Sequence, residues 1–440
     1  MDKVRIGVLG GYRGSSMINY CKGVDTAEVV AICDKSREVL DAQKGLDEEK
    51  CIALYDNFDE FIQHDMDAVV LANYAHEHAP FAIKALKKGK HVFSEVLPAG
   101  NMKEAIELIE TVEETGLVYA YGENYCYMNG PYEMRRLYRE GKIGEFEYGE
   151  CEYIHNCEPI WHSITYGEKD HWRNNMYSTF YCTHSLGPII HMTGLRPVSV
   201  IGLEGTKNER SLRVGSKRAP FGIEMVTLEN GGIIKSIHGD LYKNSVWYSV
   251  YGSKGRMETA REDTRSEKHK HLYVNCDEYS GEYGTENITD YYPELADNEF
   301  AQKFTHGGSD YYSMDNFVRK IMDDPEADII DVYEAMDMFL PGYFAYLSIL
   351  DGNKSKEIPN LRDKAARDEW RNYTGCTDPK TAGDMLWPTC SLGTPDIADE
   401  VYGYMKYLWN EESKKTEGTY RTRSFKQGGK YRESGTTGEK

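Results

Sequence analysis

The chain has 440 residues, of which 40% are hydrophobic and 12% aromatic, with 34 tyrosines against 13 phenylalanines. This length suffices for two or three domains with cores of their own, and the composition excludes a disulfide-stapled miniprotein or a globally disordered chain. Lys and Arg (52) against Asp and Glu (72) give a formal charge of -20, which repels phosphate backbones and anionic lipid headgroups. We therefore expect neither nucleic acid nor a membrane as a partner.

The cysteines and the N-terminal sequence bear on the cellular compartment. The ten cysteines form no C-x-x-C pair and have no regular spacing, which is typical of reduced thiols rather than of a disulfide framework. The sequence MDKVRIGVLGG leads directly into an apolar run, without the basic segment or cleavage site of a secretion signal. No apolar run reaches the roughly 18 residues of a membrane span. We expect a cytoplasmic protein.

The first 125 residues alternate short apolar runs with segments of helical periodicity. Strands are predicted at 4–9, 28–33, 68–72, 91–94 and 118–121, and helices between them at 80–88 and 103–115. Such alternation predicts a parallel sheet with helices on both faces. We assign residues 1–125 to a doubly wound α/β domain of the Rossmann type.

From about residue 146 the periodicity changes to two. The segments FEYGECEYIH, VSVIGLEG, IEMVTLENGGIIKSIHGD and VWYSVYGSKGRMET alternate apolar and polar residues, and residues 314–350 return to helical spacing. Runs of strands joined by hairpin turns predict a largely antiparallel open sheet with one face packed on helices. We assign residues 126–410 to this second, α+β domain, and residues 411–440, which have few apolar anchors, to a flexible tail.

The first predicted strand runs into a glycine-rich turn and then a helix. Gly10, Gly11 and Gly14 fit the dinucleotide fingerprint G-x-G-x-x-G only if the loop is one residue shorter, and Arg13 lies inside this loop. Backbone amides and a helix N-terminus would face an anion bound in such a turn. The turn alone is a weak signal.

An aspartate strengthens the interpretation of the turn. Asp34 ends the second predicted strand, where the acid that binds the 2′-hydroxyl of the adenosine ribose is expected. A carboxylate there repels a 2′-phosphate, so NAD is favoured over NADP, although Lys35 weakens this preference. The alternative is an ordinary strand-end aspartate that caps the next helix.

Beyond the turn, the chain resembles the Gfo/Idh/MocA oxidoreductase family. Residues 67–100, DAVVLANYAHEHAPFAIKALKKGKHVFSEVLPAG, are similar to that family's third and fourth strands with their H-x-H and E-K-P elements, and GENYCYM, GKIGEFEYGE and WRNNMYSTFYCTHSLGPIIHMTGLRPVSV fit the same template. The resemblance implies an NAD-dependent enzyme that forms a homo-oligomer through the open sheet of its second domain. It also implies that the cofactor groove is lined by Asn73, His76, His78, Glu95 and Asn124.

Two departures from this family concern its catalytic groups. Glu95 is followed by Val96 where the E-K-P element has lysine, and Gly187 stands where an aspartate often follows the active-site histidine, here His184. A plain dehydrogenase of the family would use that lysine to polarise or deprotonate the alcohol. This chain therefore needs another acid or base.

Further motifs resemble one subgroup, glycoside hydrolase family 109, over most of residues 1–375. These are THSLGP at 183–188, HGGSD at 306–310 and DVYEAMDMFLP at 331–341. Enzymes of that family hydrolyse a glycosidic bond with a bound NAD rather than with two carboxylates. The resemblance implies Tyr125 and His184 as catalytic residues, with His171 nearby.

The implied chemistry is oxidation at C3 of a pyranose, loss of the C2 proton, elimination at C1, addition of water and return of the hydride. It needs one base and one acid or oxyanion donor, and a tyrosine and a histidine serve if the site shifts their pKa values toward neutrality. It needs no metal, and no carboxylate or cysteine completes a ligand set with His76 and His78. The expected substrate is a small carbohydrate or glycoside.

Four further residues are candidates for substrate binding. Trp172 would stack on a sugar face and Arg173 would donate to hydroxyls, or the two form a domain interface. His306 and Asp310 would close the pocket, or they belong to the N-cap of the next helix. Two other functions stay open: a simple NAD-dependent sugar or polyol dehydrogenase that releases NADH, and a non-catalytic nucleotide-binding protein.

Overall fold

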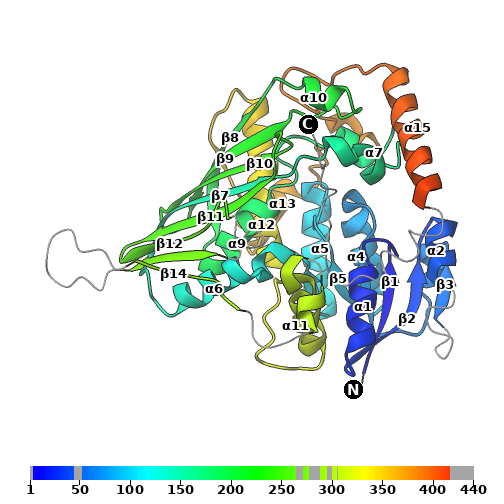
Figure 1. The fold of residues 1–440 in the computed structure, drawn as a ribbon, viewed down its shortest axis with the longest axis horizontal. Helices are drawn as coiled ribbons and strands as arrows, with labels where there is room; N and C mark the ends of the chain where they lie inside the picture. Colours follow the sequence, from blue (N-terminus) through cyan, green and yellow to red (C-terminus); the bar gives the residue numbers. More distant parts are fainter. Residues whose placement is uncertain are drawn as a thin grey trace, which may run out of the picture.

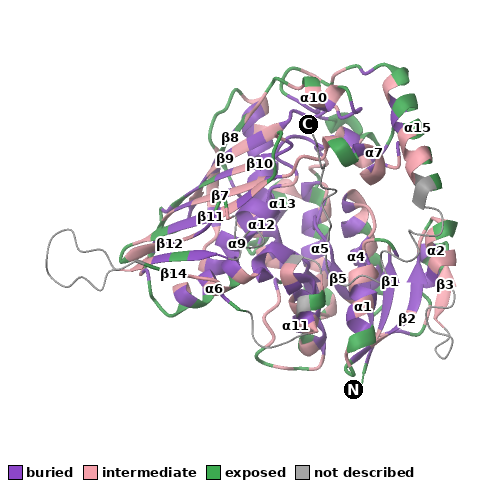
Figure 2. Cartoon of the chain, in the orientation of Figure 1, coloured by how far each residue is buried: buried purple, intermediate pink, exposed green. Residues whose placement is uncertain are grey.

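The computed structural model describes residues 3–43, 52–263, 271–276, 288–294, 300–304 and 306–416. Within these ranges, the strands form one sheet of six and one of nine (Figure 1). Buried residues concentrate in the strands of the first sheet and in two helices beneath the second (Figure 2). The molecule thus has two domains, and the predicted fold class is confirmed.

The N-terminal sheet is parallel throughout, in the order β3-β2-β1-β4-β5-β6. Its strands are β1 (Val4–Leu9), β2 (Ala27–Cys33), β3 (Ala53–Tyr55), β4 (Ala68–Leu71), β5 (His91–Ser94) and β6 (Tyr119–Tyr121). Its helices are α1 (Ser15–Gly23), α2 (Arg37–Gln43), α3 (Phe58–Phe61), α4 (His78–Lys87) and α5 (Met102–Thr115). The five predicted strands are confirmed, and β3 is an additional edge strand.

Helix α5 shows how the sequence begins and ends such an element. The Asn101 side chain accepts the Glu104 backbone N–H at 3.0 Å, and the Glu104 carboxylate accepts the Gly100 N–H at 2.8 Å. This reciprocal capping satisfies two N–H groups that the helix itself cannot pair. Gly116 ends the helix in the left-handed conformation, φ 63°. Burial raises the pKa of Glu104 to about 7.

The second sheet has the order β14-β13-β12-β11-β7-β10-β9-β8-β15. Its strands are β7 (Phe146–Ile154), β8 (Pro197–Glu204), β9 (Phe221–Leu228), β10 (Ile233–Gly239), β11 (Ser245–Gly252), β12 (Gly255–Thr259), β13 (Leu272–Cys276), β14 (Ile288–Tyr291) and β15 (Lys356–Glu357). The pairs are antiparallel except β7 with β10. The largely antiparallel sheet is therefore confirmed, with one parallel pair at its centre.

Helices α9 and α12 pack on one face of this sheet (Figure 1). The remaining α-helices are α6 (Asn129–Arg139), α7 (Trp161–Ile164), α8 (Trp172–Asn175), α9 (Thr183–Thr193), α10 (Glu209–Leu212), α11 (Ser309–Ile321), α12 (Val332–Leu350), α13 (Lys364–Trp370), α14 (Pro379–Ala382) and α15 (Asp399–Thr416). The 3-10 helices are η1 (Ala75–Glu77), η2 (Asn124–Tyr127), η3 (Glu158–Ile160), η4 (Ala301–Lys303), η5 (His306–Gly308) and η6 (Gly383–Met385).

Two elements cross the predicted domain limits. Helix α11 packs on α1 and β5, and its Phe317 ring lies 5.6 Å from the Phe93 ring, so this late segment completes the core of the N-terminal domain. Helix α15 continues to Thr416, past residue 411, where the tail is predicted to start. Residues 417–440 of that predicted tail lie outside the described residues.

Candidate active site

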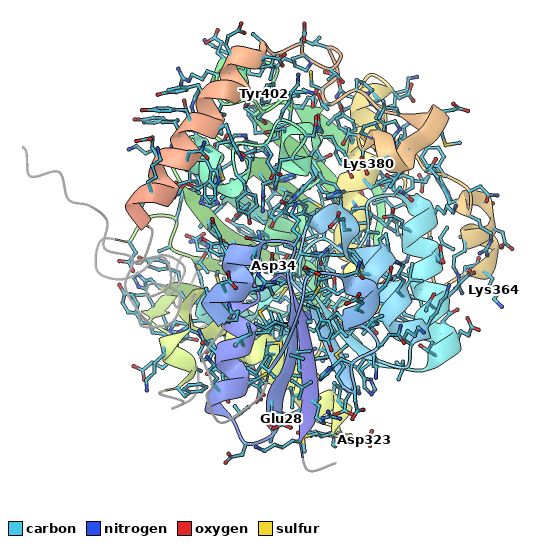
Figure 3. The ribbon with its side chains drawn as sticks, turned by 90° about the vertical axis from the view of Figure 1, so that its right-hand side faces the viewer. Glu28, Asp34, Asp323, Lys364, Lys380 and Tyr402 are labelled. Atoms are coloured by element: carbon cyan, nitrogen blue, oxygen red, sulfur yellow. The ribbon has the colours of Figure 1, made fainter. Side chains whose placement is uncertain are left out.

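The carboxyl ends of the parallel strands face the second domain. In Figure 3, Asp34 lies at the end of the strands that points to the second domain, and Glu28 lies at the opposite end. Ligands of doubly wound sheets bind outside the carboxyl ends of the strands. Most predicted site residues of the N-terminal domain follow these ends directly in the sequence.

The glycine turn after β1 is closely packed. Gly10 has φ +91°, and a Cβ there would lie 2.4 Å from the Ala72 carbonyl oxygen. A Cβ on Gly14 would lie 2.4 Å from Val8 Cγ1. Both positions therefore require glycine. The backbone of the turn can approach a ligand closely, as dinucleotide binding demands.

Asp34 connects this turn to β2. Its Oδ2 accepts the Gly11 N–H at 2.8 Å, and its Oδ1 accepts the Ser36 N–H at 2.8 Å. Burial raises the pKa of Asp34. Lys35, which could have favoured a 2′-phosphate, places its Nζ 4.0 Å from the centroid of the Tyr74 ring. Each carboxylate oxygen retains a lone pair for a ribose hydroxyl.

Arg13 reaches from the glycine turn to acidic side chains of two other segments. Its Nη2 lies 2.6 Å from Glu95 Oε1, and its guanidinium donates to both oxygens of Asp310 at 3.1 and 3.0 Å. Asn124 Nδ2 donates to the same Asp310 at 2.9 Å. Burial opposes the charge of Arg13, but Asp310 and Glu95 outweigh burial and raise its pKa. We call these four residues the Arg13 clamp; it unites three predicted cofactor residues with Asp310, which is predicted to bind substrate.

The turn after β4 carries three buried polar atoms. Within the described chain, Asn73 Oδ1, His76 Nδ1 and His78 Nε2 have no hydrogen-bond partner. His78 Nδ1–H donates to the Leu97 carbonyl at 2.9 Å, and burial lowers its pKa to about 4. Burial also lowers the pKa of His76. Neutral, unpaired polar atoms at this edge of the sheet fit the amide and hydroxyl groups of a bound NAD.

The predicted histidine, His184, forms a buried pair with Glu123. His184 Nδ1 lies 2.6 Å from Glu123 Oε1, and the two residues are 7% and 0% exposed. Because a carboxylate can only accept, Nδ1 carries the proton and Nε2 remains to take another. Glu123 lies two residues after the end of β6, whereas His184 lies in α9. In this geometry the histidine can act as a base that the carboxylate orients.

Gly187 explains why this carboxylate fits. A Cβ at Gly187 would lie 2.9 Å from Glu123 Cγ, so a side chain at this position would collide with Glu123. The aspartate that the family pattern places here is therefore replaced by a glutamate from another element. Glu123 was not among the predicted site residues; its signal in the sequence is an acidic residue in the otherwise uncharged run YAYGENY.

Three tyrosine rings surround His184. The centroids of the Tyr125, Tyr153 and Tyr181 rings lie 4.3, 4.8 and 5.1 Å from that of His184. Burial raises the pKa of Tyr125, and Glu123 raises it further. This shift is opposite to the one that a tyrosine base needs. Tyr125 is therefore a protonated hydroxyl, suited to donate to a developing oxyanion. Tyr153 and Tyr181 were not among the predicted site residues.

His171 lies where the two domains meet. Its Nδ1 accepts the Arg173 backbone N–H at 3.2 Å as the N-cap of α8, and its ring is 4.8 Å from the Tyr74 ring. Burial, followed by Arg173, lowers its pKa to about 2. It is a neutral capping residue here, and its catalytic role stays a prediction. The Arg173 guanidinium lies 4.4 Å from the Trp172 ring and 5.5 Å from the Tyr181 ring.

The other predictions can be placed only in part. The side chain of His306 lies outside the described part of the chain. No group of three or more His, Cys, Asp or Glu in the described ranges could hold a metal ion. No described helix has both the length and the apolarity to cross a bilayer.

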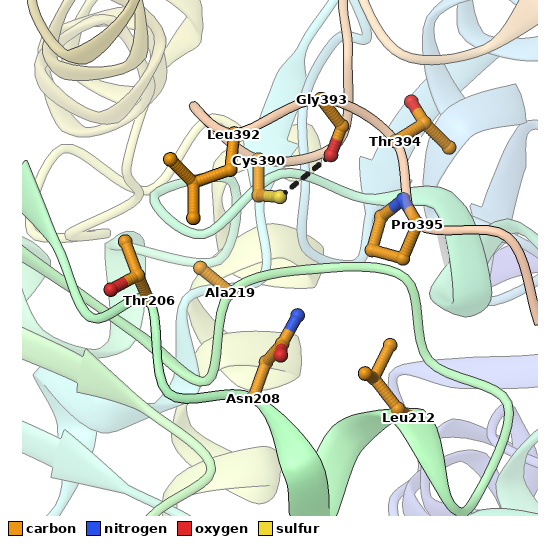
Figure 4. Close-up of a pocket in the computed structure, with 9 residues that line it drawn as sticks. All are labelled: Thr206, Asn208, Leu212, Ala219, Cys390, Leu392, Gly393, Thr394 and Pro395. Carbon is orange, nitrogen blue, oxygen red and sulfur yellow. Dashed lines mark hydrogen bonds between the residues drawn. The ribbon is translucent and has the colours of Figure 1, made fainter.

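A small pocket of about 250 Å³ lies elsewhere, between the β8–α10 connection and residues 390–395 (Figure 4). Its lining includes Cys390, whose Sγ donates to the Gly393 carbonyl at 2.8 Å, and no charged side chain. Burial raises the pKa of Cys390. None of the residues described above lines this pocket, so it is not a candidate for the chemistry of His184.

Comparisons with known proteins agree with this geometry. Residues 4–123 match the model of an oxidoreductase family with an NAD-binding Rossmann fold, Gfo/Idh/MocA. A glycosyl hydrolase family 109 protein of Solibacter usitatus is 26% identical over 420 residues, 84% of this chain and 89% of the relative. A glycosyl hydrolase family 109 protein of Shewanella sp. (strain ANA-3) is 33% identical over 203 residues, 43% of this chain and 44% of that relative.

Solved structures share the fold. Scyllo-inositol dehydrogenase from Lactobacillus casei, with bound NAD(H) and scyllo-inositol, has a TM-score of 0.62 at 17% identity, covering 82% of this chain and 100% of that one. Myo-inositol 2-dehydrogenase from Lactobacillus plantarum has a TM-score of 0.62 at 18% identity, covering 81% and 99%.

The Rossmann domain, its glycine turn and the buried histidine–carboxylate pair define an NAD-dependent oxidoreductase. The predicted cofactor and enzyme class are thereby confirmed. Residues 4–123 thus match the Gfo/Idh/MocA oxidoreductase family, and the chain is similar to glycosyl hydrolase family 109 proteins, as its motifs indicated.

Proposed function

We propose that this enzyme is a redox-assisted glycosidase acting on a hexosyl substrate. The observation that carries the proposal is the Glu123–His184 pair beside Tyr125, at a site where Val96, 6% exposed, replaces the lysine of plain dehydrogenases. The relatives named glycosyl hydrolase family 109 proteins support the same activity. Bound NAD supplies a hydride acceptor and later returns the hydride, so the cycle consumes no cofactor.

The residues of this chain supply the proton transfers. His184 Nε2 takes the proton of the C3 hydroxyl, and the Glu123 carboxylate stabilises the imidazolium that forms. The ketone at C3 acidifies the C2 proton. Loss of this proton forms the C1–C2 double bond and expels the C1 substituent, which takes up a proton and leaves as its alcohol. The Tyr125 hydroxyl donates a hydrogen bond to the developing oxyanion. Water then adds its hydroxyl at C1 and a proton at C2. The C3 carbon regains its hydride and the C3 oxygen regains the proton held by His184, so the sum of all steps is hydrolysis.

The Arg13 clamp supports a cofactor that stays bound to the enzyme. Its Asp310 is 1% exposed and belongs to α11, so the glycine turn is bonded to a helix distant in sequence. A turn held in this way favours a cofactor that stays bound between turnovers. Asn73, His76 and His78 would complete the groove on the opposite side.

A simple sugar or polyol dehydrogenase is the second candidate. The fold shared with inositol dehydrogenases and the ability of a histidine–carboxylate pair to deprotonate an alcohol favour it. This enzyme would release NADH in proportion to the substrate oxidised. The glycosidase releases sugar and aglycone without net NADH.

The deciding experiment incubates the purified protein with aryl hexosides in deuterated water, after mass analysis of the cofactor in a denatured supernatant. Bound NAD with deuterium at C2 of the released sugar supports the glycosidase, and accumulating NADH without release refutes it. Tyr125→Phe and His184→Ala should each lose at least about 100-fold in kcat while cofactor stays bound. Tyr404→Phe, at a tyrosine 56% exposed on α15, is the matched control.

We also propose a cytoplasmic homo-oligomer joined through the outer face of the second sheet. Apolar side chains that are 37–43% exposed support an interface there: Ile201, Leu203, Ile233, Tyr251 and Tyr273. Light scattering after size exclusion should show a dimer or larger species, and Leu203→Glu should shift it toward the monomer. A monomeric wild type would refute the interface.

A further inference from the structure

Arg218 is a buried cation whose hydrogen-bonding capacity is largely unused. The residue lies between α10 and β9 and is 5% exposed. Within the described residues, its Nε–H has no acceptor, and its one ion pair joins Nη2 to Asp240 Oδ2 over 4.0 Å. Its guanidinium also lies 5.5 Å from the Trp161 ring. Burying a guanidinium with so few partners is costly, which points to a ligand that supplies acceptors.

Arg218 and its charged neighbours together carry a net positive charge. Arg173 is the second cation, and it lies close enough to lower the pKa of Arg218, after burial. Asp240 is the one nearby carboxylate among the described contacts of Arg218, and its Oδ1 accepts the Cys157 N–H at 2.9 Å. Burial raises the pKa of Glu224 to about 8 and lowers that of His238 to about 3, so both are neutral near pH 7. Arg218 thus has one cation, Arg173, and one carboxylate, Asp240, among its charged neighbours, in addition to its own charge.

This cluster borders the Glu123–His184 pair. The Arg173 guanidinium lies 5.5 Å from the Tyr181 ring, which is 5.1 Å from the His184 ring. Tyr153, 4.8 Å from His184, interacts electrostatically with both arginines. Tyr153 and Arg173 are only half-buried, so this side of the His184 surroundings remains partly accessible, whereas Arg218 is buried behind it. A group bound by the two arginines would belong to the same small molecule that His184 deprotonates.

We propose that the substrate carries an oxyanion, bound by Arg218 together with Arg173. The planar guanidinium fork matches a carboxylate or a sulfate through two parallel hydrogen bonds. A hexuronic acid and an ester sulfate of a hexose share this chemistry. The proposal rests on the proposed function and narrows its substrate class from neutral to acidic sugars.

Binding is the direct test, because it needs no turnover. Calorimetry with the purified full-length protein compares D-glucuronate, D-galacturonate and D-glucose 6-sulfate with neutral D-glucose and D-galactose. We expect at least one acidic sugar to bind about 30-fold or more tightly than its neutral counterpart. Arg218→Met and Arg173→Met should each abolish this preference, and Arg218→Lys should keep part of it. Arg213→Met, at a 62% exposed arginine paired with Glu158, should keep all of it.

The outcomes separate this proposal from the proposed function. Equal binding of acidic and neutral sugars, an unchanged preference in Arg218→Met, or loss of NAD from that variant would overturn the oxyanion site. If Arg218→Met does not fold, Arg173→Met alone decides, since Arg173 is half-buried. Arginine-dependent binding without cleavage of any aryl hexuronide would support the site and refute the glycosidase. Cleavage of neutral aryl hexosides without tighter binding of acidic sugars would support the glycosidase and refute the oxyanion site.

Discussion

The carboxylate of Glu123 should set how strongly His184 acts as a base. Glu123→Gln keeps the size of the side chain but replaces a charge-assisted hydrogen bond of 2.6 Å, between residues that are both buried, with a neutral one. Charge-assisted bonds contribute about 1.5 to 3 kcal/mol and neutral bonds about 0.5 to 1.5, so the imidazolium loses about 1 to 2 kcal/mol of stabilisation. This loss corresponds to a fall of about 5- to 30-fold in kcat/KM.

The loss of kcat/KM in Glu123→Gln is larger if the new side-chain amide turns its NH2 group toward His184 Nδ1. The histidine is then held in the tautomer that has its proton on Nε2 and cannot act as a base; in a serine protease triad this costs about 10⁴-fold. The assay is kcat/KM on the substrate that the experiments above identify, together with cofactor content and thermal unfolding of the variant. A Glu123→Gln enzyme with normal cofactor and kcat/KM within twofold of the wild type would refute the role of the pair.

Three further variants test other contacts. Gly187→Ala should gain about 1 kcal/mol of helix propensity in α9 yet lose activity at least about tenfold, because its Cβ would meet Glu123 Cγ at 2.9 Å. Asp310→Asn should raise the Kd for NAD about tenfold, because it removes the charge that anchors Arg13. Glu104→Gln should become more stable relative to the wild type as pH rises from 5 to 8. The raised pKa of Glu104, about 7 against 4.5, means that its ionisation costs the folded state stability above the unfolded pKa, up to about 3 kcal/mol by pH 8.

Each variant has its own measurement and control. Gly403→Ala in α15, where a Cβ meets nothing within 4 Å, should gain stability and keep full activity in the assays used for Gly187→Ala. Asp324→Asn breaks an Arg319 pair at the surface and should leave NAD titrations unchanged. Chemical unfolding at pH 5 and pH 8 measures the Glu104 effect; a stability difference that is constant between the two values contradicts the assigned burial of this carboxyl.

Local patterns predicted the elements whose partners are near in sequence. The buried run of β4 and the amphipathic α5 read correctly because burial on both sheet faces and on one helix face leaves distinct periodicities. Strand β3 has three half-buried residues, too few for a period. The parallel pairing of β10 with β7 joins strands nearly eighty residues apart, and alternation alone does not distinguish it from a hairpin.

The residues of the candidate site likewise divide into those with a local sequence motif and those without one. Arg13, Glu95, Asn124 and His184 were predicted because each belongs to a motif with a local signature, and the structure places them in the candidate site. Glu123 was missed, because its function depends on the space that Gly187 leaves, and such a steric relation between two elements has no fixed spacing. Arg218 was missed for a related reason. It lies in a loop without a sequence motif, and its burial with only a distant carboxylate partner is a property of the folded structure.

Because of the Arg13 clamp, the N-terminal domain cannot be transferred to another protein as an independent unit. Residues 4–123 match a family model by themselves, but Asp310, which holds the arginine of the glycine turn, comes almost three hundred residues later. A chimera that exchanges only the first domain would pair the turn with a foreign α11. Cofactor exchange by domain grafting should therefore transfer α11 together with the Rossmann domain.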